Sequence, residues 1–275
     1  MVRKDKAQKY LNPRSTRWRI RKTGPFFLGK RIELIFGLLK KLRRHKEIRR
    51  HIGVSLAEYE TYDDWEMRLE EAGATWTLDH GRMNLVHFST IRTYYLEPVI
   101  AEIEILHKTL GRPVKILEVG CGNGTNLKLL AERLGQKVVL HGIDISPARL
   151  EQGRTYWGRA LDGIEMVEDS ATTLSTVPDK SVDLVYSLHC LEQIPYAIDN
   201  CLAAIARVVR SRVIFVEPVW EFANSTQKLY TLFGDQLRTL LPEIEQSPLQ
   251  IESSWRAELI ANPLNQTGFV VAKKL

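Results

Sequence analysis

A short glycine-rich segment, ILEVGCGNGTN at residues 116–126, holds the residues best suited to ligand chemistry. Gly120, Gly122 and Gly124 alternate with other residues, and glycine permits both positive φ angles and the close approach of a ligand to the backbone. Glu118 lies two positions before the first glycine. A carboxylate there would repel a phosphate, and the spacing also differs from the G-x-G-x-x-G pattern that receives a pyrophosphate. The segment therefore favours a ligand that carries an ammonium group.

Acidic residues also follow the next two apolar runs. Asp144 ends LHGID, where a carboxylate can accept hydrogen bonds from both hydroxyls of a ribose. The alternative is that Asp144 caps the following helix, although Ser146 and Pro147 would begin that helix equally well. Asp169 and Ser170 follow the third run, and such a pair on its own more often marks a turn. We favour the ribose role for Asp144 because it follows the glycine segment at the distance typical of nucleoside-binding folds.

The elements that must position these residues alternate between strands and helices after Pro113. Short apolar runs predict strands at 115–119, 138–143, 164–167, 182–187 and 212–217, with helices at 125–135, 147–160 and 195–210. This alternation indicates a parallel, doubly wound α/β sheet with right-handed crossovers. A helix near 222–241 precedes two candidate strands at 249–256 and 267–273. Because a short connection joins these two strands, they should pair antiparallel at the edge of the sheet.

Together these segments resemble the class I S-adenosylmethionine-dependent methyltransferases, in the broad family that includes the ubiquinone- and menaquinone-pathway enzymes. The glycine segment and the stretch LEQIP…AIARVV within 191–209 carry the resemblance, which covers residues 111 to about 218. Gln193 replaces the His that is common there, and Arg210-Ser211-Arg212 replaces the usual Pro-Gly-Gly. The resemblance implies a Rossmann-like methyltransferase fold with a mostly parallel, seven-stranded sheet, an antiparallel C-terminal edge and a helical N-terminal extension.

The resemblance also implies that S-adenosyl-L-methionine is the cofactor. Glu118 would orient its ammonium group, and the glycine segment would contact its methionine part. Asp144 would bind the ribose, Ile145 would pack on the adenine face, and Asp169 with Ser170 would accept from the adenine amino group. The implied cofactor-binding residues are Glu118, Gly120, Cys121, Gly122, Gly124, Asp144, Ile145, Asp169, Ser170 and Leu188.

His189 is the candidate catalytic residue. It lies just past the fourth strand, at the carboxyl end of the sheet, where such folds bind ligands. It would remove a proton from an acceptor hydroxyl as that hydroxyl attacks the methyl group. The alternative is a residue that packs or contacts adenosine, because alignment alone accounts for much of such a transfer. The sequence places no carboxylate partner beside it. The other histidines lack ligand-like spacing, so we expect no metal.

The N-terminal part differs in composition from the rest. Residues 1–50 hold 18 Lys/Arg and 3 Asp/Glu, so a strongly basic arm accounts for the net charge of +6. An apolar stripe at helical spacing accompanies the arm: Leu28, Ile32, Ile35, Leu39 and Leu42. This pattern fits a helix in a membrane interface or one packed on the core, with RNA contact ranked third.

We therefore divide the chain into a basic arm with an amphipathic helix (1–54), a helical lid or cap (55–110) and the methyltransferase domain (111–275). Within the lid we expect one helix at 57–81, broken near Gly73, and another at 86–110, where Tyr94 and Tyr95 fit a core aromatic stripe.

Three cysteines are too few for a disulfide framework, and the first 25 residues do not resemble a secretory signal. No apolar run approaches the roughly 18 residues that span a bilayer. We expect a cytoplasmic protein, with contact to a membrane surface as the alternative.

The sequence thus predicts methyl transfer to a small-molecule, lipid-linked or glycan-like acceptor, with O-methylation favoured. An RNA methyltransferase that uses the basic arm is the main alternative. A NAD-dependent oxidoreductase of the same layout is disfavoured by the glycine spacing and by Glu118. A non-catalytic scaffold at a membrane surface is disfavoured because the motifs at all three cofactor positions are intact.

Overall fold

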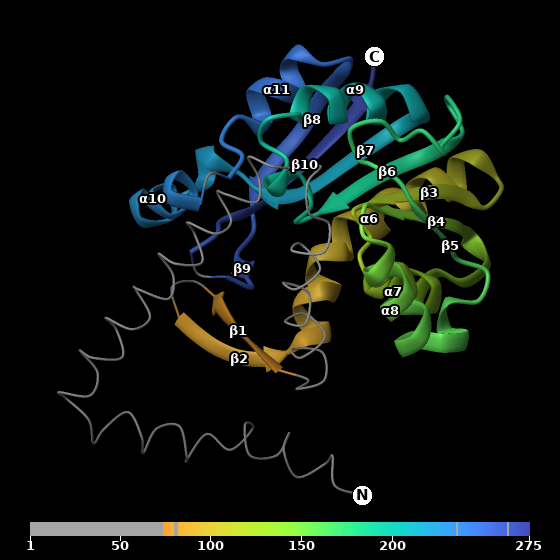
Figure 1. The fold of residues 1–275 in the computed structure, drawn as a ribbon, viewed down its shortest axis with the longest axis horizontal. Helices are drawn as coiled ribbons and strands as arrows, with labels where there is room; N and C mark the ends of the chain where they lie inside the picture. The colour runs from red at the N-terminus through yellow and green to blue at the C-terminus, as the bar shows by residue number, and fades with distance from the viewer. Residues whose placement is uncertain (1–73, 80–81, 235, 263) are drawn as a thin grey trace, which may run out of the picture.

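The computed structural model describes residues 74–79, 82–234, 236–262 and 264–275 (Figure 1). The basic arm and amphipathic helix predicted for residues 1–54, and the first part of the helix predicted for 57–81, lie outside the described residues. The described part contains a seven-stranded sheet flanked by helices and a separate three-stranded sheet.

The large sheet has the strand order β5-β4-β3-β6-β7-β10-β8. Its strands are β3 (Val114–Val119), β4 (Val138–Asp144), β5 (Glu165–Glu168), β6 (Val182–Leu188), β7 (Val209–Pro218), β8 (Leu249–Arg256) and β10 (Thr267–Lys274). The first five in spatial order pair in parallel, and β10 pairs antiparallel with both β7 and β8. The predicted mostly parallel, seven-stranded sheet is therefore confirmed, including its antiparallel C-terminal edge, whereas most of the predicted helical N-terminal extension lies outside the described residues.

Helices cover both faces of this sheet. They are α6 (Phe88–Leu110), α7 (Thr125–Leu134), α8 (Pro147–Trp157), α9 (Ile198–Val208), α10 (Ser225–Gly234) and α11 (Leu240–Gln246), with short 3-10 turns η1 (Gly135–Lys137), η2 (Gly158–Leu161), η3 (Leu191–Gln193) and η4 (Trp220–Phe222). One apolar core lies under α6, α7 and α8, and a second lies under α9 and α11 on the opposite face (Figure 1). Because both faces are covered, central strands such as β6 are buried along their whole length.

Helix α6 closes the edge of the first core and matches the expected helix at 86–110. Its apolar face is buried at Ile91, Tyr95, Val99 and Ile103, so Tyr95 lies in the core as expected. Gly111 ends the helix with a φ of 64°, and its N–H donates to the His107 carbonyl. A left-handed residue at this position favours glycine. Among the described residues, no helix is long and apolar enough to cross a membrane.

The segment before α6 is a β-hairpin, so the helix predicted through residue 81 is wrong in its described part. Strands β1 (Ala74–Asp79) and β2 (Arg82–His87) pair antiparallel, and β9 (Leu259–Ile260) adds to β1. The residues of β1 alternate in type and include two threonines, a pattern that favours a strand. The partner strand β9 lies about 180 residues away in the chain, so local periodicity could not reveal it.

The helix predicted near 222–241 is also divided in two. Helix α10 ends at Gly234, and α11 begins at Leu240. Glycine favours the end of a helix, and Pro242 is tolerated in the first turn of α11 because that turn has no intrahelical acceptor for its missing N–H. The division of the chain into three segments stays a prediction.

Candidate functional site

The glycine segment forms the turn from β3 into α7. Gly120, Gly122 and Gly124 have φ angles of 75°, 54° and 77°, in the left-handed region that favours glycine. The backbone N–H groups of Gly120 and Cys121 both donate to the Ile143 carbonyl, at 2.8 and 2.9 Å, which ties the turn to β4. A Cβ atom on Gly120 would lie 2.3 Å from the Cys190 Sγ. The loop can therefore keep its path only with glycine at position 120.

Glu118 is completely buried beneath this loop. Its Oε1 accepts a hydrogen bond of 2.6 Å from the Asn126 amide, whereas its Oε2 is buried without a hydrogen bond of ordinary geometry among the described residues. The buried hydroxyl of Tyr186 faces the same carboxyl group. Burial raises the pKa of Glu118 to about 8. An unsatisfied buried carboxylate oxygen is costly, so this atom is suited to receive a donor from a ligand.

Arg92 on α6 faces the same place, and the sequence analysis did not identify it. Its guanidinium donates to the Asn126 Oδ1 at 3.3 Å, so Arg92, Asn126 and Glu118 form a continuous polar chain. The available signal was an arginine directly after Ile91, on a helix whose buried face is otherwise apolar. Arg92 brings a positive charge to the side of the site that faces the glycine loop.

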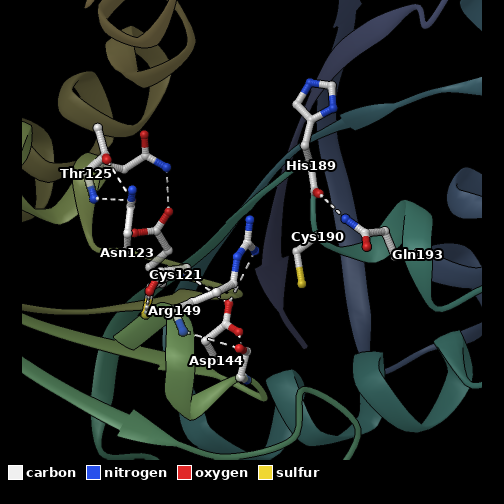
Figure 2. A network of polar contacts seen from close by, with 12 residues as sticks. Cys121, Asn123, Thr125, Asp144, Arg149, His189, Cys190 and Gln193 are labelled. Atoms are coloured by element: carbon white, nitrogen blue, oxygen red, sulfur yellow. Dashed lines mark hydrogen bonds and ion pairs between the residues drawn. The ribbon is translucent and has the colours of Figure 1, made fainter. Parts of the chain in front are cut away.

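Asp144 links the glycine loop to the start of α8. It is 4% exposed, and its two carboxylate oxygens accept from the Gly122 N–H at 2.8 Å and from the Ser146 N–H at 2.9 Å. The Arg149 guanidinium lies 4.0 Å from the same carboxylate (Figure 2). Ser146, not Asp144, caps α8, because its side chain accepts from the Arg149 N–H. Each Asp144 oxygen keeps lone-pair capacity for a further donor.

The remaining predicted cofactor residues differ in what they present. Ile145 is 42% exposed, which leaves an apolar surface beside Asp144. Cys121 and Leu188 are buried, and Cys121 packs closely against Gly142 of β4. A ligand would therefore meet the Cys121 backbone rather than its thiol.

Asp169 and Ser170 build a tight turn after β5. The Asp169 carboxylate accepts from the Ser170 N–H, the Ser175 hydroxyl, and both the N–H and hydroxyl of Thr176, at 2.7 to 3.0 Å. Burial works to raise the pKa of Asp169, but these donors outweigh it, and the pKa is lowered. This is the turn role that the sequence left as an alternative. The contact of this pair with adenine stays a prediction.

His189 follows β6 directly and has two engaged ring nitrogens. Nδ1 lies 3.4 Å from the Glu192 Oε1, and Nε2 lies 2.9 Å from the Thr267 hydroxyl. Burial works to lower the pKa of His189, but the carboxylates of Glu192 and Glu217 outweigh it and raise the pKa above its ordinary value. The carboxylate partner that could not be placed from the sequence is therefore Glu192. In Figure 2 the imidazole points away from Asp144, whereas the Cys190 thiol points toward it.

Glu217, at the end of β7, holds the chain that follows His189. It is completely buried and accepts from the backbone N–H groups of Cys190, Leu191 and Glu192, at 3.0, 3.1 and 3.4 Å. Burial raises the pKa of Glu217 to about 7. The sequence signal was a glutamate that ends an otherwise apolar strand, RVIFVE.

The substitution Glu118→Gln is expected to reduce the loss in the free energy of unfolding that occurs as the pH rises from about 4.5 to about 8. The pKa of Glu118 rises from 4.5 in the unfolded chain to about 8 in the folded one, so the folded state holds a proton that the unfolded state releases. The contribution of Glu118 to stability is therefore fully present below about pH 4.5 and is lost as the pH rises toward about 8. Glutamine cannot ionise but still accepts from Asn126.

Urea unfolding of the full chain at pH 5 and pH 8 measures this difference. We expect the free energy of unfolding to fall less between the two pH values in Glu118→Gln than in the wild type, with Glu217 and His189 contributing to the slope that remains. The exposed Glu245 on α11 provides the matched control, Glu245→Gln, which should behave as the wild type. An unchanged slope in Glu118→Gln would contradict a proton held at Glu118.

The structure thus brings the predicted residues together at two adjoining places. The glycine loop, Glu118 and Asp144 form one, and His189 with its carboxylates forms the other; they meet where Cys190 approaches Gly120. Within the described part of the chain, no cluster of three or more His, Cys, Asp or Glu could hold a metal ion.

Comparisons with known proteins agree with this geometry. Residues 116–212 match the family described as "Methyltransferase domain". The chain is 29% identical over 156 residues to the aklanonic acid methyltransferase of Streptomyces sp. (strain C5), covering 55% of this chain and 66% of that protein. It is 29% identical over 87 residues to the trans-aconitate 2-methyltransferase of Methylobacterium nodulans, covering 32% and 31%. The chain thus spans slightly less than two thirds of the first relative's length and about a third of the second's.

A solved structure, a putative sarcosine dimethylglycine methyltransferase from Galdieria sulphuraria, aligns with a TM-score of 0.53. The identity is 16%, and the alignment covers 67% of this chain and 84% of that one. At this identity the likeness supports the fold.

Proposed function

We propose that this chain, whose residues 116–212 match the methyltransferase domain family, is a class I S-adenosylmethionine-dependent methyltransferase that transfers the cofactor's methyl group to an oxygen atom of a small-molecule acceptor. The narrower relationship to the quinone-pathway enzymes stays a prediction. The observation that carries the proposal is the buried Oε2 of Glu118, without a hydrogen bond of ordinary geometry, beneath a glycine loop in the left-handed conformation.

The residues at this place fit the cofactor group by group. The Glu118 Oε2 would accept from the ammonium group, and Arg92 is suited to the carboxylate of the same methionine part. Asp144 retains lone pairs for the ribose hydroxyls, and the exposed Ile145 offers an apolar surface to the adenine. The cofactor supplies a methyl group that its sulfonium already activates. The protein's own part is to align the acceptor with that methyl group and to exclude water.

The names of the curated relatives support a small-molecule acceptor. They are named for aklanonic acid and for trans-aconitate, which are both small organic acids. His189 supports transfer to oxygen, because an imidazole paired with a carboxylate can take the proton that a hydroxyl acceptor must lose. A lipid-linked or glycan-like acceptor remains within the proposal.

The basic arm still motivates two proposals about partners. Contact of residues 1–54 with an anionic membrane surface stays a prediction, with RNA contact ranked below it. Both concern residues outside the described part of the chain. The match of residues 116–212 to the methyltransferase domain family disfavours the oxidoreductase and scaffold alternatives.

Transfer of a labelled methyl group tests the proposed function. The full chain would be incubated with S-adenosylmethionine carrying a ¹³C-methyl group, in one reaction with a small-molecule extract of the source cells and in a parallel reaction with their total RNA. The products would be examined by NMR and mass spectrometry. We expect a product whose methyl carbon has the chemical shift of an oxygen-bound methyl. A methyl on nitrogen or carbon, or label found only in RNA, would contradict the proposal.

A further inference from the structure

Glu192 is a carboxylate partner of His189 that the sequence analysis did not identify. One of its carboxylate oxygens lies 3.4 Å from the His189 Nδ1, and the other accepts from the Asn265 amide at 2.7 Å. Glu192 is therefore held by two contacts, one with His189 in its own segment and one with Asn265 just before β10. We infer that Glu192 is a positioning residue that fixes His189 as a general base, and that this base serves an uncharged hydroxyl on the acceptor. The inference rests on the proposed function.

The backbone at His189 supports a fixed role. His189 has a φ of 54°, in the left-handed region that a residue with a side chain adopts only when its surroundings enforce it. Glu217 supplies that constraint by accepting the next three backbone N–H groups. The backbone therefore fixes the direction of the Cα–Cβ bond of His189, and the side-chain contacts orient the imidazole ring.

The side-chain contacts then select one tautomer. A carboxylate can only accept, so the Glu192 contact places the proton on Nδ1 and leaves the Nε2 lone pair available. Nε2 already accepts from a hydroxyl, that of Thr267, at 2.9 Å. This is the distance at which a general base takes a proton.

The Thr267 hydroxyl can leave the His189 Nε2 and still keep a hydrogen-bond partner. Its hydroxyl also lies 3.2 Å from the Tyr95 hydroxyl, which is held by the Ala261 N–H at 3.0 Å. Burial raises the pKa of Tyr95 to about 12, so Tyr95 stays neutral. An acceptor hydroxyl can thus take over Nε2 while Thr267 remains bonded to Tyr95. The His189 side chain is 24% exposed, which gives a ligand access to the ring.

The charges around His189 favour a neutral acceptor. Glu192 from η3 faces it as a carboxylate, and Glu217 from β7 faces it with a pKa that burial raises to about 7. Arg92 of α6 contributes positive charge, and Tyr95 and Thr267 are neutral. A carboxylate acceptor would add an anion beside the buried Glu192 carboxylate and would have no proton for His189 to take. A hydroxyl has such a proton and adds no charge.

The step balances without a further reactant. The proton of the acceptor hydroxyl passes to the His189 Nε2 as the acceptor oxygen bonds to the methyl carbon. The carbon–sulfur bond breaks, and its electron pair stays on sulfur, which leaves S-adenosylhomocysteine. The imidazolium that forms is stabilised by Glu192 through the Nδ1–H.

NMR of the ¹⁵N-histidine-labelled full chain tests the positioning role without knowledge of the acceptor. His189 is assigned by the signal that disappears in His189→Asn. In the wild type we expect the Nδ1–H tautomer and a pKa above the ordinary value of histidine. In Glu192→Gln, which keeps an oxygen for Asn265, we expect the pKa of His189 to fall by at least about one unit. Glu245→Gln is the matched control and should leave it unchanged.

The outcomes separate this inference from the proposed function. An Nε2–H tautomer in the wild type would overturn the inference even if the variant failed to fold, and so would an unchanged pKa in folded Glu192→Gln. The affinity for S-adenosylhomocysteine should stay within about threefold of wild type in that variant. If the wild type bound no S-adenosylhomocysteine while His189 titrated as expected, the proposed function would fail and the pairing with Glu192 would stand.

Mild alkali applied to the ¹³C-methyl product tests the acceptor class. A methyl ether of a hydroxyl survives this treatment, whereas a methyl ester of a carboxylic acid is hydrolysed and releases labelled methanol. We expect the label to stay on the product. Release of methanol would overturn the hydroxyl assignment.

The rate at which the same product forms, measured against pH, tests the positioning role. The Glu192→Gln variant should shift the acidic limb of this pH–rate profile to lower pH, and an unmoved limb would contradict the positioning role.

Discussion

Gly120→Ala is expected to lower the affinity for S-adenosylhomocysteine at least 100-fold, which corresponds to about 2.7 kcal/mol. The added Cβ would lie 2.3 Å from the Cys190 Sγ and 2.6 Å from its Cβ, so the loop or the Cys190 segment must move. The φ of 75° adds strain for any residue with a side chain. Because the same loop carries Gly122 to Asp144, its displacement disturbs the contacts proposed for the methionine part and for the ribose.

Gly111→Ala is the matched control for this variant. Gly111 has a similar φ of 64°, but a Cβ there would meet nothing within 4 Å. The Gly111→Ala variant has the same backbone strain but at the far end of α6, so its affinity for S-adenosylhomocysteine should stay within about threefold of wild type. Isothermal calorimetry on folded variants makes the comparison. The double variant Gly120→Ala/Cys190→Gly should regain part of the affinity, and equal affinity of Gly120→Ala and wild type would contradict the proposed loop.

His189→Ala is expected to lower the rate of methyl transfer at least about 100-fold while the affinity for S-adenosylhomocysteine stays within about threefold. From the sequence alone the residue had no carboxylate to raise its basicity, and a role in the pocket was favoured over that of a base. Glu192 at 3.4 Å now favours the base. The measurement is the initial rate of ¹³C-methyl transfer to the acceptor extract at the pH optimum of the wild type.

The control for this variant is His107→Ala, at the opposite end of α6, where the ring contacts the Arg112 carbonyl. It should transfer methyl groups at the wild-type rate. If His189→Ala lost cofactor affinity and kept its rate, His189 would be a residue of the pocket and the transfer would depend on alignment alone.

Much of the fold could be predicted because its signals are local. Buried parallel strands appear as short apolar runs, and the glycine turn appears as a spacing, so β3 to β7 and the loop at 120–124 were found close to their observed bounds. The β1–β2 hairpin could not be found in the same way. Its strands are short, its third strand comes from residues 259–260, and the acidic, aromatic sequence before it favoured a helix.

The candidate site divides along the same line. Glu118, Gly120 and Asp144 belong to a motif with fixed spacing, so their places at one edge of the sheet were predictable. Thr267 lies 78 residues after His189 in the chain and comes beside it only because β10 pairs antiparallel with β7. Arg92 depends likewise on how α6 packs over α7. Contacts of this kind follow from tertiary structure, which one sequence does not display.

Calorimetric titration of the wild-type full chain with S-adenosylhomocysteine, alongside a titration with NAD, tests the central claim most directly. The glycine spacing, the buried Oε2 of Glu118 and the carboxylate of Asp144 are assigned to a cofactor with an ammonium group and a ribose. We predict one-to-one binding of S-adenosylhomocysteine, with NAD bound at least 100-fold more weakly. Absence of S-adenosylhomocysteine binding to the folded chain, or equal binding of the two nucleotides, would contradict the account.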